Sequence, residues 1–199
     1  MASSLPDPAD LARHYARFGV ADRVLLTGHS HQAWPDVARA AQLAAWDDAA
    51  RHVDDKWERA FAMVAEVGRG YAERLDDPDG SYVIAASTHD LLVRLLSALP
   101  LDRGRRLVTT DAEFHTIRRQ LQRLAEAGVG VEVVASTPVD TLPERLAAAV
   151  DHRTACVLVS CVLFQTGRIV RGLGEVARAC LRHGAELLVD AYHAVNVVP

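Results

Sequence analysis

The strongest constraint on the fold is an alternation of strand-like and helix-like segments that begins at residue 81. Short apolar runs alternate with longer segments whose apolar residues recur at helical spacing, and the links between them are short. This pattern predicts a three-layer α/β/α fold with a mostly parallel sheet. The predicted strands cover residues 81–86, 105–110, 129–135, 154–163 and 185–190. The predicted helices cover residues 88–99, 114–128, 142–150 and 173–184.

The first 80 residues have a different pattern. We expect a short helix over residues 7–17, capped by Asp7 or Asp10, and a short strand over 23–28. Two longer helices follow, one from Pro35 to about residue 50 and one over roughly 55–75. The run "DDPDG" then interrupts the chain before the alternation starts.

Composition excludes several classes of partner. The chain has 22 basic and 26 acidic residues, a net charge of −4, so it has no general attraction for nucleic acid or an anionic membrane. No segment has the apolar length of a membrane span, and the N-terminal run "MASSLPDPAD" lacks the features of a secretory signal. Three cysteines, an odd number, predict buried free thiols in a reducing compartment. We therefore expect a cytoplasmic protein. The cysteines are Cys156, Cys161 and Cys180.

Ligands of parallel α/β sheets bind beyond the carboxyl ends of the strands, so the residues there are the first candidates for a site. Ser87, Thr88 and His89 lead from a predicted strand into a helix, and a helix N-terminus with hydroxyls beside it suits a phosphate group. The alternative is an ordinary Ser/Thr cap. The chain lacks the GxGxxG and P-loop patterns, which disfavours dinucleotide and nucleoside triphosphate binding.

Two further strand ends carry candidates. Phe114 precedes a predicted helix, where its ring could lie on a planar cofactor or pack the helix down. Asp190 ends an apolar strand, and a carboxylate there needs a cationic or hydrogen-bond-donating partner such as a protonated pyridine nitrogen. A helix cap or a structural salt bridge is the alternative for Asp190. His193 could contact the same ligand or could be an ordinary core histidine.

A zinc-dependent hydrolase is a separate possibility. His29 and His31 form a His-x-His after the first predicted strand, a pattern that is typical of zinc hydrolases built on barrels. A zinc site needs three or four ligands, and the remaining ligands cannot be assembled convincingly from this sequence. We therefore predict no metal ligands.

Taken together, these stretches resemble the class V branch of the fold-type I pyridoxal-phosphate enzymes, and most closely kynureninase. The motifs are "STHDLL" for the phosphate, "EFHT" for the ring that stacks on the cofactor, "SCVLFQTG" with a serine near the pyridine ring, and "DAYHA" for the acid that pairs with its nitrogen. The N-terminal run "LLTGHSHQAWP" fits only loosely. The resemblance implies cofactor contacts at Thr88, His89, Phe114, Ser160, Asp190 and His193, and substrate contacts at His29 and Trp57.

The reaction implied by the resemblance is hydrolytic Cβ–Cγ cleavage of kynurenine or 3-hydroxykynurenine to an anthranilate and alanine, a step of tryptophan catabolism. The implied assembly is a homodimer. A class V aminotransferase and a cysteine desulfurase or selenocysteine lyase are alternatives within the class. One departure bears on the substrate, because the usual Phe-Pro-Thr-Asp run is replaced by Phe114, His115, Thr116 and Ile117.

A second departure concerns the lysine that forms the internal Schiff base in this family. It lies beyond the Asp-x-x-His strand, whereas the single lysine here is Lys56, on an upstream helix where we expect it to face solvent. We therefore expect an incomplete large domain of a fold-type I enzyme, with residues 1–30 as an N-terminal arm and 31–199 as the N-terminal part of the domain. No catalytic residue is predicted in this chain, so a non-catalytic fragment that needs a partner chain is a further alternative.

Overall fold

The structure is a computed structural model that describes residues 7–26, 32–101, 104–195 and 197–198. The chain divides into two compact units, Met1–Arg69 and Gly70–Pro199, which are described separately. The predicted division at residues 30 and 31 remains a prediction. No helix within the described ranges is both long and apolar enough to cross a membrane.

The first unit is helical. It contains α1 (Pro8–Ala12), η1 (Arg13–Phe18), α2 (Asp36–His52) and most of α3 (Lys56–Leu75), of which residues 70–75 belong to the second unit. The side chain of Asp7 caps α1 by accepting a hydrogen bond from the amide of Ala9 at 2.9 Å, as predicted. The predicted strand over 23–28 is wrong for residues 24–26, which form no ladder, and residues 27–28 lie outside the described ranges.

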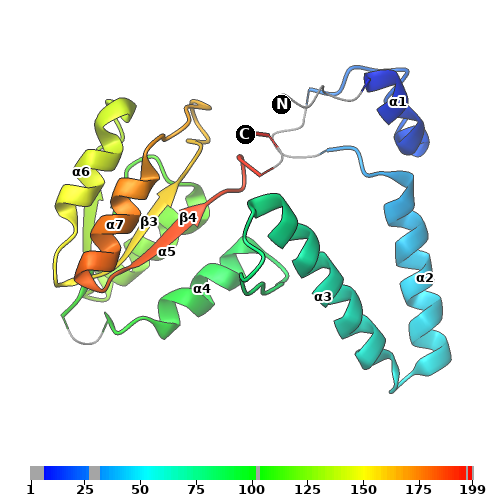
Figure 1. The fold of residues 1–199 in the computed structure, drawn as a ribbon, viewed down its shortest axis with the longest axis horizontal. Helices are drawn as coiled ribbons and strands as arrows, with labels where there is room; N and C mark the ends of the chain where they lie inside the picture. The colour runs from blue at the N-terminus through cyan, green and yellow to red at the C-terminus, as the bar shows by residue number, and fades with distance from the viewer. Residues whose placement is uncertain (1–6, 27–31, 102–103, 196, 199) are drawn as a thin grey trace. The chain divides into compact units, whose positions relative to one another are not determined.

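The second unit is built on a parallel sheet. Its strands are β1 (Arg106–Thr110), β2 (Gly130–Val134), β3 (Thr154–Ser160) and β4 (Glu186–Asp190). Their order is β2-β1-β3-β4, and every neighbouring pair is parallel. Figure 1 shows β4 beside β3. This confirms the predicted sheet, and it brings the carboxyl ends of all four strands to one edge.

Helices cover both faces of this sheet, which confirms the three-layer fold. The cluster on one face includes residues of α4 (Thr88–Ala98) and α5 (His115–Glu126). The cluster on the other face includes residues of η3 (Val139–Thr141), α6 (Leu142–Ala149) and α7 (Leu173–His183). Each of these α-helices begins and ends within two residues of its prediction.

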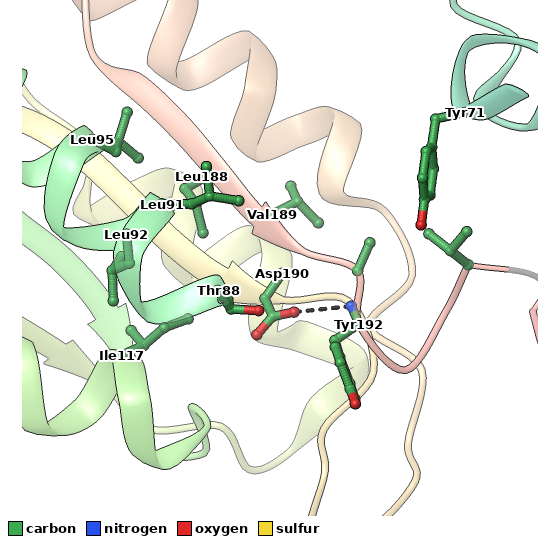
Figure 2. A pocket seen from close by; sticks show the side chains of 12 residues that line it. Tyr71, Thr88, Leu91, Leu92, Leu95, Ile117, Leu188, Val189, Asp190 and Tyr192 are labelled. Carbon is green, nitrogen blue, oxygen red and sulfur yellow. Dashed lines mark hydrogen bonds between the residues drawn. The ribbon is translucent and has the colours of Figure 1, made fainter. Parts of the chain in front are cut away.

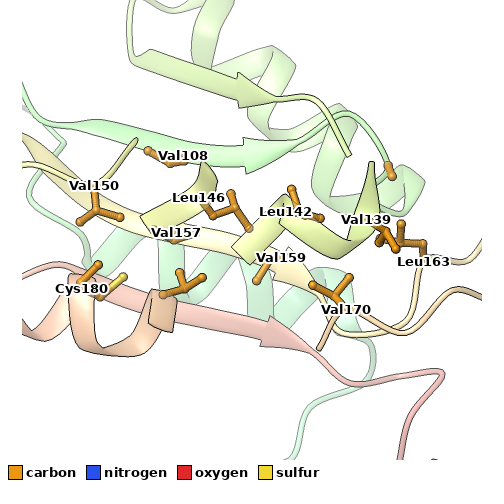
Figure 3. Packing of buried hydrophobic residues seen from close by; sticks show 13 residues of the cluster. Val108, Val139, Leu142, Leu146, Val150, Val157, Val159, Leu163, Val170 and Cys180 are labelled. Atoms are coloured by element: carbon orange, nitrogen blue, oxygen red, sulfur yellow. The ribbon is translucent and has the colours of Figure 1, made fainter. Parts of the chain in front are cut away.

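The centre of the core is β3, in which all seven residues are buried. Successive side chains of a strand point to opposite faces, so Cys156 and Leu158 join the cluster with α4 and α5. Val157 and Val159 join the cluster with α6 and α7, where they pack near Leu146 (Figure 3). An uninterrupted apolar run is therefore what a central parallel strand requires.

The predicted strand over residues 81–86 is wrong. This segment is not part of the sheet, and it forms no strand pairing with any other described residue. Val83 is 69% exposed and Ile84 is 50% exposed, so the apolar character that suggested a strand is not used in the described core. A strand is defined by hydrogen bonds to a neighbour, and its composition alone cannot supply that neighbour. The strand predicted over 154–163 also ends earlier than expected, at Ser160 rather than at residue 163.

Replacing Leu146 by alanine tests this core. Leu146 is fully buried between α6 and the sheet, so we expect Leu146→Ala to lower the free energy of unfolding by about 2–5 kcal/mol. Leu181 on α7 is 83% exposed, and we expect Leu181→Ala to change the free energy by less than about 0.5 kcal/mol. Urea unfolding followed by circular dichroism measures both. Equal losses in the two variants would contradict the assigned packing.

Candidate functional site

A cavity of about 590 Å³ opens at the carboxyl end of β4, beside the N-terminus of α4 (Figure 2). Its apolar wall comes from α4, the start of α5 and β4, and its polar groups come from Thr88, Asp190 and two tyrosines. The position matches the rule that ligands of parallel sheets bind beyond the carboxyl ends of strands. The lining residues are Tyr71, Thr88, Leu91, Leu92, Leu95, Ile117, Leu188, Val189, Asp190, Ala191, Tyr192 and Val195.

The N-terminus of α4 forms one side of this cavity. Ser87 is the N-cap, and its hydroxyl accepts a hydrogen bond from the amide of Asp90 at 3.2 Å. The first amides of a helix have no partner within the helix, and together with the helix dipole they favour an anion. Thr88 is the first helical residue and lines the cavity, as the phosphate prediction requires. His89 is exposed and does not line it.

Asp190 supplies the carboxylate of the cavity. It ends β4, and its Oδ1 accepts a hydrogen bond from the amide of Tyr192 at 2.9 Å (Figure 2). Its Oδ2 has no hydrogen-bond partner, and no ion pair reaches Asp190, among the residues that the structure describes. The salt-bridge alternative is therefore not what the described residues show. One carboxylate oxygen is available to a donor.

Ser160 lies directly beside Asp190. The two residues are register partners at the ends of β3 and β4. Two positions earlier, Leu158 and Leu188 belong to the cluster with α4 and α5, so Ser160 and Asp190 lie on that same face of the sheet. Ser160 is only 4% exposed and does not line the cavity. Its hydroxyl donates a hydrogen bond of 2.6 Å to Oε2 of Glu113.

Glu113 is a buried carboxyl group that the sequence reasoning missed. It is 2% exposed, and its Oε1 accepts a second hydrogen bond of 2.6 Å, from Oγ1 of Thr110. Burial raises the pKa of Glu113, the two hydroxyl hydrogen bonds lower it in part, and the nearby Asp190 carboxylate raises it slightly further. The available signal was the run "TTDAE", in which an acid follows closely on a strand that ends in hydroxyl residues.

Phe114 belongs to a cluster of three rings. Its ring lies 5.2 Å from that of Phe164, edge to face, and 5.2 Å from that of His115. Phe164, in the loop after β3, was not singled out from the sequence. Phe114 is 40% exposed and does not line the cavity. Its packing against Phe164 is observed, whereas stacking on a cofactor remains a prediction.

Of the other predicted site residues, His193 belongs to the second unit but does not line the cavity. His193 is half-buried, and its ring lies 5.1 Å from that of Tyr192, which does line the cavity. Trp57 belongs to the first unit, is 58% exposed, and stacks on Phe61. The ammonium of Lys56 lies 5.3 Å from the Trp57 ring, and Lys56 is half-buried rather than fully solvent-facing as expected.

The zinc-hydrolase alternative depended on one His-x-His pair. His29 and His31 lie outside the described residues. Within the described ranges, no group of three or more His, Cys, Asp or Glu side chains could hold a metal ion.

All three cysteines are free thiols. Cys156 and Cys180 are buried, as predicted, and Cys161 is half-buried. Burial raises the pKa of Cys156 to about 12, and it also raises the pKa of Cys161 and of Cys180. Cys161 lies beside the site, where its thiol donates to the backbone carbonyl of Asp190 at 3.3 Å. The thiolate is the nucleophilic form, so none of the three is activated for sulfur chemistry.

No family profile matches this chain, and no curated protein sequence matches it either. Solved structures do match. One is a lysine-to-alanine mutant of C-DES with glycine covalently linked to the PLP cofactor, with a TM-score of 0.77 and 21% identity over 98% of this chain and 51% of that one. Another is the cystine C–S lyase C-DES in complex with its reaction product cysteine persulfide, with a TM-score of 0.72 and 22% identity over 91% of this chain and 50% of that one.

The chain has the fold of a partial domain of a fold-type I pyridoxal-phosphate enzyme. It spans about half the length of each of these two structures. The predicted fold class is thereby confirmed. Both structures are of C-DES, and at 21% and 22% identity the likeness concerns the fold.

The raised pKa of Glu113 gives a prediction for stability against pH. Because the folded pKa lies above the ordinary value of 4.5, the native state keeps a proton that the unfolded chain loses, and stability falls as pH rises through this window. A glutamine side chain at this position cannot ionise. We therefore expect the stability of Glu113→Gln, relative to the parent, to increase as pH rises from about 4.5 through the raised pKa.

Urea unfolding of both proteins at several pH values between about 4 and 8 measures this difference. Glu144→Gln on the exposed side of α6 makes the same chemical change. We expect its free energy of unfolding to differ little from that of the parent over this pH range. If the free energy of unfolding of Glu113→Gln differs from that of the parent by the same amount at every pH, the raised pKa of Glu113 is contradicted.

Proposed function

We propose that this chain supplies the cofactor-binding part of a pyridoxal-phosphate enzyme that cleaves a carbon–sulfur bond of a cysteine-like amino acid. The observation that carries the proposal is that Thr88, at the N-terminus of α4, and the Asp190 carboxylate line the same cavity at the carboxyl edge of the sheet. An anion site and a carboxylate with an available oxygen are two groups that a pyridine ring with a phosphate requires.

The residues present fit the cofactor. The cavity of about 590 Å³ lies in the size range of small-molecule sites, about 300–1,000 Å³. Thr88 and the first amides of α4 would bind the phosphate, and Asp190 would hold a proton on the ring nitrogen. When bound, the cofactor serves as an electron sink for bonds at the substrate carbons. We propose the cofactor contacts predicted from sequence: Thr88, His89, Phe114, Ser160, Asp190 and His193, with His29 and Trp57 toward the substrate.

The substrate class is argued from Ile117. It stands where the kynureninase motif carries an acid, and it is 1% exposed, packed in the core cluster and part of the cavity wall. An isoleucine offers no hydrogen bond to the carbonyl or amine of an aryl ketone substrate. The cystine C–S lyase structures point the same way. Kynurenine cleavage is supported only by the sequence motifs.

We propose that the group to which the cofactor is covalently attached lies outside this chain. The chain's one lysine, Lys56, belongs to the first compact unit and contacts Trp57. Lys56 also matches no Schiff-base motif of the family that the sequence resembles, so we propose that the second unit binds and orients the cofactor and that a lysine from another polypeptide segment completes the site. We also propose a homodimer in the cytoplasm, as in the family that the sequence resembles.

Replacing Asp190 by asparagine tests cofactor binding. Pyridoxamine 5'-phosphate is the suitable probe, since it has no aldehyde that could react with Lys56 or the chain terminus. Hydrogen bonds to charged groups contribute about 1.5–3 kcal/mol, so we expect Asp190→Asn to weaken binding by roughly tenfold or more. Fluorescence titration of the ligand gives the dissociation constants.

Asp140→Asn is the matched control, because Asp140 is exposed on η3 and does not line this cavity. We expect Asp140→Asn to bind the probe as the parent does. If the parent does not bind the probe, or if the two variants bind equally, the proposed function is wrong.

The substrate class has its own test with stable conjugates. We expect N-phosphopyridoxyl-L-cysteine to bind more tightly than N-phosphopyridoxyl-L-kynurenine, because the apolar Ile117 leaves the polar aryl ketone without a partner. The two conjugates share the cofactor and the amino-acid backbone, so their difference reports the side chain alone. Tighter binding of the kynurenine conjugate would favour kynurenine cleavage instead.

A further inference from the structure

Glu113 connects two parts of the site that are distant in sequence. Its carboxyl group bridges Thr110 at the end of β1 and Ser160 at the end of β3, with both oxygen–oxygen distances at 2.6 Å. Glu113 and Ser160 are 47 positions apart in the chain. The bridge therefore holds the loop after β1 against the end of β3.

This loop carries Phe114, the residue that follows Glu113 and caps α5. Ser160, on the other side of the bridge, is the register partner of Asp190. A continuous path thus runs from the Phe114 backbone through the Glu113 side chain and Ser160 to the strand that ends in Asp190. The bridge thus links the loop that carries Phe114 to the strand end beside Asp190.

The aromatic contacts alone do not fix this distance. Phe114 packs on Phe164 and His115, but Phe164 lies in the loop after β3 and His115 is in α5, and both are partly exposed. The hydrogen bond between Glu113 and Ser160 is buried, since Glu113 is 2% exposed and Ser160 is 4% exposed. Buried hydrogen bonds are less subject to exchange with water, so the bridge is the more rigid connection.

We propose that Glu113 is a positioning residue that ties the Phe114 loop to the end of β3 and so sets the spacing between the Phe114 ring and the Asp190 carboxylate. This inference rests on the proposed function, because these two groups would contact the face and the nitrogen of the cofactor ring. In this proposal Glu113 itself does not contact the cofactor. Its effect on the cofactor is transmitted through Phe114 and Ser160.

The test compares two replacements that fill similar space. Glu113→Gln keeps a hydrogen-bonding group at both oxygen positions, whereas Glu113→Met fills the volume without hydrogen bonds. With pyridoxamine 5'-phosphate as the probe, we expect Glu113→Gln to bind within about twofold of the parent and Glu113→Met to bind roughly five- to tenfold more weakly. Ser160→Ala removes one side of the bridge and is expected to weaken binding in the same direction.

A double-mutant cycle with Phe114→Leu then asks whether Glu113 acts through the ring. We expect Glu113→Met to weaken binding by less than about twofold when Phe114 is already leucine, because the spacing no longer matters without the ring. Urea unfolding of every variant shows that binding is compared between folded proteins. If Glu113→Met does not fold, the cycle is made with Ser160→Ala in its place.

Two outcomes overturn this inference while leaving the proposed function intact. In the first, Glu113→Met binds as well as Glu113→Gln, which means that Glu113 only fills space. In the second, the effects of Glu113→Met and Phe114→Leu multiply, which means that Glu113 does not act through the ring. A parent chain that does not bind the probe, or binding that is independent of Asp190, overturns both proposals.

Discussion

The burial of β3 on both faces is the constraint on which the rest of the second unit depends. All seven of its residues are buried, and its two neighbours, β1 and β4, are parallel to it. A parallel sheet needs helices on both faces to cover such a strand, and α4 with α5 and α6 with α7 provide them. In β3 itself, the polar side chains of Thr154 and Ser160 stand at the two ends of the strand. Because helices cover both faces of the sheet, the candidate site lies at the carboxyl edge of the strands.

Two carboxyl groups at this edge have different environments and different parts in the site. Glu113 is enclosed, and burial favours its neutral form. Asp190 is half-buried at the cavity, with one oxygen bonded to the Tyr192 amide and the other available. The buried Glu113 thus connects the ends of β1 and β3, while Asp190 at the cavity can contact a charged ligand. Ser160 lies between them and contacts the first directly.

The likeness to the C–S lyase structures concerns the fold, and the chemistry is argued from the cavity. A TM-score of 0.77 over 98% of this chain shows the shared topology. The proposed preference for a cysteine-like substrate over kynurenine rests on one local feature, Ile117 in the cavity wall. The high pKa of the buried thiols adds that this chain's own cysteines would not carry sulfur as nucleophiles.

Local sequence patterns determined the helices of the second unit, four of the predicted strands and the cavity residues Thr88 and Asp190. These features depend on periodicity, on helix capping and on the position of a residue at a strand end, all of which are readable within a few neighbouring residues. Only the tertiary structure decided that residues 81–86 do not join the sheet, since a strand exists through its partner. It also revealed Glu113 and Phe164, because the bridge to Ser160 and the contact with Phe114 join segments that are far apart in the chain. Sequence identifies which side chains can take part in a site, and packing decides which of them meet.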